Sequence, residues 1–95
     1  MNLEKAKKRI AKKVKMGFQG YPKISISYAG DSKDLADEVI VKFEAEEGSE
    51  VMEERFLSKI DAREDEVIQS VIVKMMERCE AKTVSLSVNI ELKSK

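Results

Sequence analysis

Histidine and tryptophan are absent from this 95-residue chain, and cysteine, proline and glycine occur only once, once and four times. Without histidine, the chain lacks the usual general base near neutral pH and the commonest metal ligand. A single cysteine cannot form an internal disulfide, which agrees with a reducing compartment. These absences favour a cytoplasmic protein and weigh against histidine-based catalysis.

Long apolar runs and catalytic motifs are also missing. No run approaches the ~18 apolar residues of a membrane span, and the first residues lack the apolar centre of a signal peptide. No glycine-rich phosphate loop or Gly-x-Ser-x-Gly pattern occurs. Carboxylates crowd the loop around Asp34, but their spacing does not match a calcium-binding EF-hand. We therefore expect no catalytic residue, no metal, no cofactor, no small-molecule ligand and no membrane contact.

The strongest periodic signal lies between residues 61 and 80, and it predicts a helix over residues 62–80. Asp61 and Glu64 have the spacing of a capping pair. Only Val73 falls on the wrong half of this helix. On a 3.6-residue period the apolar half holds seven side chains, namely Val67, Ile68, Val71, Ile72, Met75, Met76 and Cys79. Cys79 is thus expected to be a buried small hydrophobe.

A first helix is predicted over residues 2–16, where a narrow apolar stripe repeats at helical spacing. Glycine and proline end it before residue 22. The stripe consists of Leu3, Ala6, Ile10 and Val14, and lysines and one arginine cover most of the remaining surface. This helix has little apolar surface for a core and much charge to display.

Alternation of apolar and polar residues predicts strands over residues 23–29, 38–46 and 82–92. Residues 50–59 are predicted as a further strand, with a short helix as the alternative. The side chains expected to point inward are Ile24, Ile26, Tyr28, Val39, Val41, Phe43, Ala45, Met52, Phe56, Ile60, Val84, Leu86, Val88, Ile90 and Leu92. The outer face of every strand is polar, which indicates one sheet with one exposed surface.

The fold class predicted from these elements is α+β, as a single domain over residues 1–95. The order α-β-β-β-α-β gives a two-layer sandwich, with two helices on one face of a four-stranded mixed sheet. The second helix returns the chain along the sheet, so the last strand should be parallel to the first. The expected strand order across the sheet is 3-2-1-4.

The net charge of zero conceals a strong segregation of charge along the chain. Residues 1–33 hold nine basic and two acidic side chains, whereas residues 34–80 hold six and fifteen. The surfaces expected to take part in interactions are basic positions of the first helix and acidic positions near residue 50. They are Lys5, Lys8, Arg9, Lys12, Lys15, Glu46, Glu50, Glu53 and Glu54. Segregated charge of this kind suits electrostatic docking.

The basic helix also suits a phosphate backbone, because clustered lysines and arginines bind nucleic acid without regard to sequence. This alternative requires the helix to share a surface with Lys23, Lys82 or Lys93, with no carboxylate intruding. Only Phe18, Tyr21 and Phe56 are free for stacking on bases. An anionic membrane is disfavoured, since the helix has no aromatic anchor.

The order helix, three strands, helix over residues 2–80 resembles the double-stranded RNA-binding domain. That family carries a basic cluster at the start of its second helix. Here the corresponding positions hold Asp61, Glu64, Asp65 and Glu66, which would repel phosphate. The chain is therefore not assigned to the family. We expect a small non-enzymatic protein that acts through contacts with a protein partner or with itself, and nucleic-acid binding is the alternative.

Overall fold

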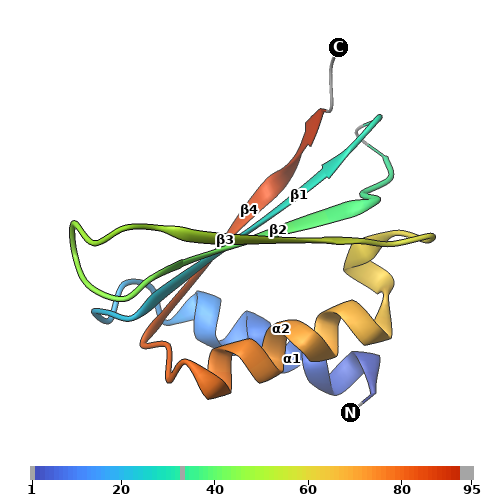
Figure 1. Cartoon of the computed structure of the whole chain (residues 1–95). Helices are drawn as coiled ribbons and strands as arrows, with labels where there is room; N and C mark the ends of the chain where they lie inside the picture. Colours follow the sequence, from blue (N-terminus) through green and yellow to red (C-terminus); the bar gives the residue numbers. More distant parts are fainter. Residues whose placement is uncertain (1, 33, 93–95) are drawn as a thin grey trace.

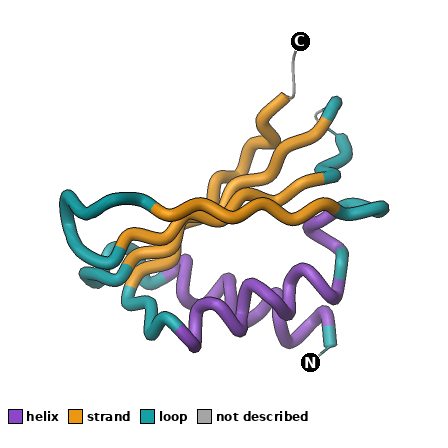
Figure 2. The backbone as a smooth tube through the Cα atoms, viewed as in Figure 1, coloured by secondary structure: helices purple, strands orange, loops and turns teal. Residues whose placement is uncertain are grey.

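The computed structural model describes residues 2–32 and 34–92, and it confirms the predicted order of elements (Figure 1). Both helices lie on one face of a twisted four-stranded sheet (Figure 2), so the fold is an α+β sandwich. The elements are α1 (Leu3–Lys15), β1 (Lys23–Gly30), β2 (Glu38–Glu44), β3 (Met52–Leu57), the 3-10 turn η1 (Ala62–Glu64), α2 (Glu66–Arg78) and β4 (Thr83–Leu92).

The strand order is β3-β2-β1-β4, as predicted, with β3 and β4 at the two edges. β2 is antiparallel to both β1 and β3, and β4 is parallel to β1. The register between β1 and β4 shifts between Leu86 and Ile90, where β4 holds two extra residues. Val88 lies in this stretch, and its side chain is outside the described part of the structure.

The core lies between the sheet and the two helices, where the predicted inward faces of β1 and β2 are confirmed. Ile24, Ile26, Val39 and Val41 are each at most 2% exposed. α1 contributes Ala6 and Ile10, both buried, and so its narrow stripe is sufficient to hold it on the molecule. Burial of a large aliphatic side chain stabilises a fold by about 1.5–3 kcal/mol, so this cluster is the main source of stability.

The start of α2 differs from the prediction of a helix from residue 62. Asp61 caps only the short turn η1, where it accepts a hydrogen bond from the backbone N–H of Arg63. The cap of α2 is Asp65, which accepts from the N–H groups of Val67 and Ile68. Two acidic caps lie four residues apart in this segment, and the sequence pattern alone favoured the wrong one.

The buried face of α2 also differs from the predicted stripe. Val67 was expected to be buried but is 71% exposed, whereas Val73, expected on the polar side, is 1% exposed. Gln69, also predicted to be outside, is buried, and its amide donates to the Tyr28 hydroxyl and to the Ala62 carbonyl. The face is rotated because α1 packs against the Val73 side of α2. The helix is therefore covered on two sides, by the sheet and by α1.

The third strand is confirmed, but it is shorter than residues 50–59 and its inward residues are poorly covered. Met52 is 64% exposed and Ile60, beyond the strand end, is 55% exposed, so both were wrongly expected to be buried. Ala45 and Leu92, also expected inward, are exposed at or beyond the ends of β2 and β4. The helices therefore cover the middle of the sheet better than its β3 edge.

The outer face of the sheet is less open than predicted. Ile40 is buried there, opposite Arg55 in the register, and Arg55 forms ion pairs with Glu53 and Glu38. Thr83, expected to be exposed, is buried because it accepts from the Gln19 N–H and donates to the Gly20 carbonyl. The loop after α1 is thereby fixed to the start of β4.

Acid should weaken the fold partly through Asp61. The adjacent Arg63 guanidinium, with Nε 2.8 Å from Oδ1, lowers the pKa of this carboxyl to about 2. Because the folded-state pKa is below the ordinary value, the stabilisation is present above pH ~4 and is lost as the pH falls to ~2. We expect the unfolding free energy of D61N to fall less than that of the wild type between these pH values, measured by urea titration. An identical fall would contradict this role.

Candidate interaction surfaces

The basic residues of α1 divide into two groups. Three are held by contacts with residues 64–81: Lys7 Nζ lies 2.8 Å from Glu64 Oε2, Arg9 Nη1 lies 2.7 Å from Glu77 Oε2, and Lys13 Nζ donates to the Ala81 carbonyl. The other four are exposed and form no ion pair with the described residues. They are Lys5, Lys8, Lys12 and Lys15, hereafter the lysine stripe, and at 100° per residue they fall within an arc of about 80°.

The predicted acidic surface lies at the opposite edge of the sheet. Glu46 and Glu50 are exposed on the β2–β3 hairpin, and Glu53 is held by Arg55 on the outer face of β3. Glu54 is exposed and faces the helix side, because its partner in β2 is the buried Val41. α1 packs against α2 and β4, far from this edge. The predicted basic and acidic residues are therefore not brought together. The charge segregation along the chain is only partly retained in space, because α1 lies beside α2 and forms ion pairs with Glu64 and Glu77.

The β3 edge carries exposed apolar side chains at both ends of the strand, between charged side chains. Of the nine large apolar side chains that are exposed, four lie within residues 51–60, although this segment is short. They are Val51, Met52, Leu57 and Ile60, hereafter the β3 patch. The strand itself leaves one row of backbone N–H and C=O groups unpaired, since it is the end strand of the sheet. A half-covered apolar edge with free backbone groups is a typical site of protein association.

Hydrogen bonds position the end of the β3 patch. The Ser58 N–H donates to the Asp37 carbonyl, and the Ala62 N–H donates to the Ala36 carbonyl. These bonds hold the segment after β3 beside the segment before β2, where Leu35 is also exposed. The apolar corner at this end of β3 is therefore part of the folded structure.

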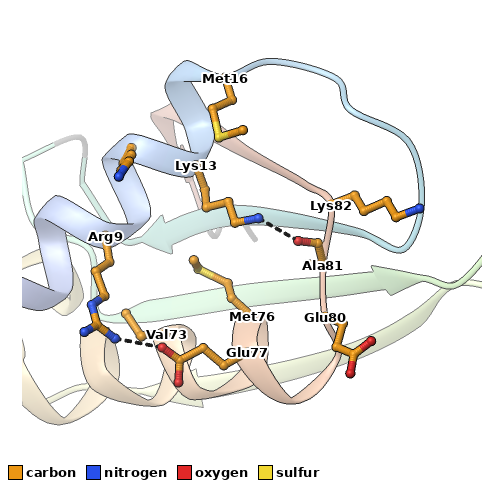
Figure 3. Close-up of a pocket in the computed structure, with 10 residues that line it drawn as sticks. Arg9, Lys13, Met16, Val73, Met76, Glu77, Glu80, Ala81 and Lys82 are labelled. Atoms are coloured by element: carbon orange, nitrogen blue, oxygen red, sulfur yellow. Dashed lines mark hydrogen bonds and ion pairs between the residues drawn. The ribbon is translucent and has the colours of Figure 1, made fainter.

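A cleft of about 590 Å³ opens between the C-terminal halves of α1 and α2 (Figure 3). Its floor is apolar and its rim is charged, with basic side chains from α1 facing Glu77 and Glu80 of the α2 end. The lining residues are Arg9, Lys12, Lys13, Met16, Val73, Met76, Glu77, Glu80, Ala81 and Lys82. Lys82 thus shares a surface with the basic helix, as the nucleic-acid alternative requires. The same alternative requires that no carboxylate intrude, and this is not met, because Glu77 and Glu80 line the cleft. Lys93 lies outside the described residues.

The loop after α1 presents an aromatic pair that periodicity did not single out. Phe18 is 62% exposed, and its ring packs edge-to-face on Tyr21 with centroids 5.4 Å apart. Besides Thr83, the loop is held by the Lys82 N–H, which donates to the Pro22 carbonyl. Two glycines with positive φ, Gly17 and Gly20, allow its tight path. The signal in the sequence was the cluster of glycine, aromatic and proline residues at 17–22.

Comparison of the chain with protein-family models, curated proteins and solved structures finds no match. Function must therefore be argued from these surfaces. In the described part of the chain, no three histidine, cysteine, aspartate or glutamate side chains are placed to hold a metal ion. None of its helices is long and apolar enough to cross a membrane. Cys79 is half-buried at the end of α2.

Proposed function

We propose that this protein is a self-associating interaction module, and that two copies pair through their β3 edges to form a symmetric dimer. The observation that carries the proposal is the β3 patch beside an unpaired strand edge. On this proposal the protein acts by association and not by catalysis. It does so in a reducing compartment such as the cytoplasm, where the single thiol of Cys79 remains free.

The sequence of β3 complements itself when two copies run antiparallel about a two-fold axis at Glu54. Val51 then lies opposite Leu57 of the second copy, and Met52 lies opposite its Phe56. Glu53 lies opposite Arg55 of the second copy, and Arg55 lies opposite its Glu53. Two pairs of opposite charges therefore face each other across the interface. The one unfavourable contact is between the two copies of Glu54. In this register the helices of both copies are on the same face, so the exposed Met52 and the half-buried Phe56, both on the helix side, gain further cover.

The test is the mass by light scattering across a salt series. We expect a dimer that persists in high salt, because apolar pairs and backbone hydrogen bonds are little affected by screening. L57E should give a monomer, since it puts a charge in the interface at a side chain that is 76% exposed and does not support the fold. The matched control is L92E, at an exposed leucine on the opposite edge of the sheet. A monomeric wild type, or equal effects of both variants, would refute the proposal.

The register has its own test. In a background where Cys79 is serine, E54C places two thiols at the two-fold axis, so we expect an intermolecular disulfide under mild oxidation. E54Q should tighten the dimer by up to about five-fold, because directly opposed like charges on paired strands destabilise them. A dimer in which E54C does not cross-link would retain the β3 interface but reject this register.

Docking of the lysine stripe onto the acidic hairpin of another copy is less well supported. Such a contact joins two different surfaces, so each dimer would leave one of each free, and association would continue into chains. It would also weaken steeply with salt. A mass that grows with concentration at low salt and falls at high salt would identify this mode.

A further inference from the structure

Three features meet at the C-terminal end of α1: the lysine stripe, the exposed Phe18 ring and the cleft between the helices. Thr83 bonds to the backbone of Gln19 and Gly20 and so fixes the loop that carries Phe18 beside the start of β4. The Lys82 side chain lies against the same loop, since a Cβ added at Gly20 would be 3.8 Å from its Cδ. Lys12 therefore joins the lysine stripe to the cleft, and Lys82 joins the cleft to the loop that carries Phe18.

The lysine stripe is a line of positive charge that forms no ion pair with a described carboxylate. It extends about 15 Å along α1, given a rise of 1.5 Å per residue. Lys12 belongs both to the stripe and to the cleft rim. Glu4 is the one acidic residue on α1 and lies at its N-terminal end, away from the cleft. A negatively charged backbone lying along this helix would therefore meet four free ammonium groups in sequence.

Phe18 provides a stacking platform at the end of this line. Its ring is mostly exposed, yet the edge-to-face contact with Tyr21 fixes its orientation. Exposed aromatic rings beside basic residues are the usual means of binding unpaired bases, because every base has a flat face. A membrane-binding helix, in contrast, needs large apolar side chains on the face that meets the membrane. The solvent-facing side of α1 holds lysines instead.

The cleft has the size of a small-molecule pocket, with an apolar floor of Val73 and Met76 and with Met16 at its α1 edge. Of its two carboxylates, Glu77 is paired with Arg9, whereas Glu80 forms no ion pair with the described residues. Glu80 also has a φ of 51°, at the position after the helix end where glycine is favoured. The Glu80 N–H donates to the Glu77 carbonyl and the Ala81 N–H to that of Met76, which completes the turn.

We propose that this surface binds single-stranded nucleic acid. The phosphates lie on the lysine stripe and Lys82, one base stacks on Phe18, and a neighbouring base enters the cleft. Glu80 accepts a hydrogen bond from the exocyclic amino group of that base, so a base with an amino group is preferred over uracil or thymine. This contact gives a reason for a glutamate at a position whose backbone conformation favours glycine.

The first experiment measures fluorescence anisotropy with labelled ten-nucleotide oligo-C and oligo-U, as RNA and as DNA. We expect oligo-C to bind more tightly, with affinity falling at least ten-fold between about 50 and 200 mM salt. The triple variant K8Q/K12Q/K15Q should lose binding. The matched control K42Q/K59Q/K74Q removes the same charge from exposed lysines elsewhere and should bind as the wild type does.

Glu80 and Phe18 are tested separately. E80G should melt at the same temperature as the wild type or higher, because it relieves the left-handed backbone, yet lose the preference for oligo-C over oligo-U. F18L should weaken both oligonucleotides about ten-fold while leaving the preference intact. The proposal is overturned by absence of binding at low salt or by equal losses in the control triple variant. It is also overturned if E80G keeps the preference, or if anionic phosphatidylserine vesicles bind and the oligonucleotides do not.

Discussion

Replacing Val73 with aspartate should unfold the protein, whereas the same replacement at Val67 should leave it folded. Val73 is 1% exposed and belongs to the buried apolar cluster on the α1 side of α2. A carboxylate there would lose its water, and it could reach Arg9 or Lys13 at the neighbouring cleft only by breaking the apolar packing. Burial of an unpaired charge costs several kcal/mol, a large part of the ~5–14 kcal/mol expected for a domain of this size. Circular dichroism with urea titration measures the difference.

Val67 is the matched control for this prediction, because it carries the same side chain on the same helix but is 71% exposed. An aspartate there also lies in the first turn of α2, near the positive end of the helix dipole. The periodic pattern of the sequence predicts the reverse ranking, since it buries Val67 and exposes Val73. A folded V73D with an unfolded V67D would therefore reject the orientation of α2 described above.

Replacing Gly30 with alanine should destabilise the protein by about 3 kcal/mol. A Cβ at this position would lie 2.1 Å from the carbonyl oxygen of Leu35, far inside contact distance. The carbonyl cannot move away easily, because the next residue, Ala36, is fully buried and accepts a hydrogen bond from the Ala62 N–H. At 4–8 °C per kcal/mol, the melting temperature should fall by roughly 10–25 °C in a thermal scan.

Gly48 is the control for the Gly30 prediction. It has a φ of 81° on the β2–β3 hairpin, and nothing lies within 4 Å of an added Cβ. G48A therefore meets only the strain of the left-handed conformation, about 1–2 kcal/mol. If G48A lowered the melting temperature as much as G30A, the close approach of the Leu35 carbonyl would not be the reason for the effect.

The alternation of apolar and polar residues was sufficient to predict the sheet, because every strand has one apolar face. Ile24, Ile26, Val39 and Val41 share one period, and that period decides which way each strand faces. It was insufficient for α2, whose apolar residues span more than half the helix. Which side of this broad apolar surface is buried depends on where α1 packs. The spacing of apolar residues within α2 carries no information about the position of α1.

The candidate surfaces were predicted in part. Lys5, Lys8, Lys12 and Lys15 are exposed and free of ion pairs, as a solvent-facing basic helix requires, but Arg9 is held by Glu77. Helical spacing places these four lysines on one side of α1, so the stripe can be predicted from the sequence. The cleft cannot, because it forms where the ends of two helices distant in sequence meet. The left-handed Glu80 cannot either, because glycine is the usual signal for this conformation at a helix end and is absent there.

The parallel pairing of β1 with β4 has a consequence for the newly made chain. Lys23 pairs with Thr83, 60 residues later in the chain. The backbone groups on one edge of β1 are therefore hydrogen-bonded only after β4 has been made. Until residues 83–92 have emerged from the ribosome, β1 therefore has one unpaired edge. Contacts this distant in sequence form slowly. An unpaired edge on an interior strand is a site at which wrong strand pairing can begin, so β1 is the strand most exposed to misassembly before β4 pairs with it.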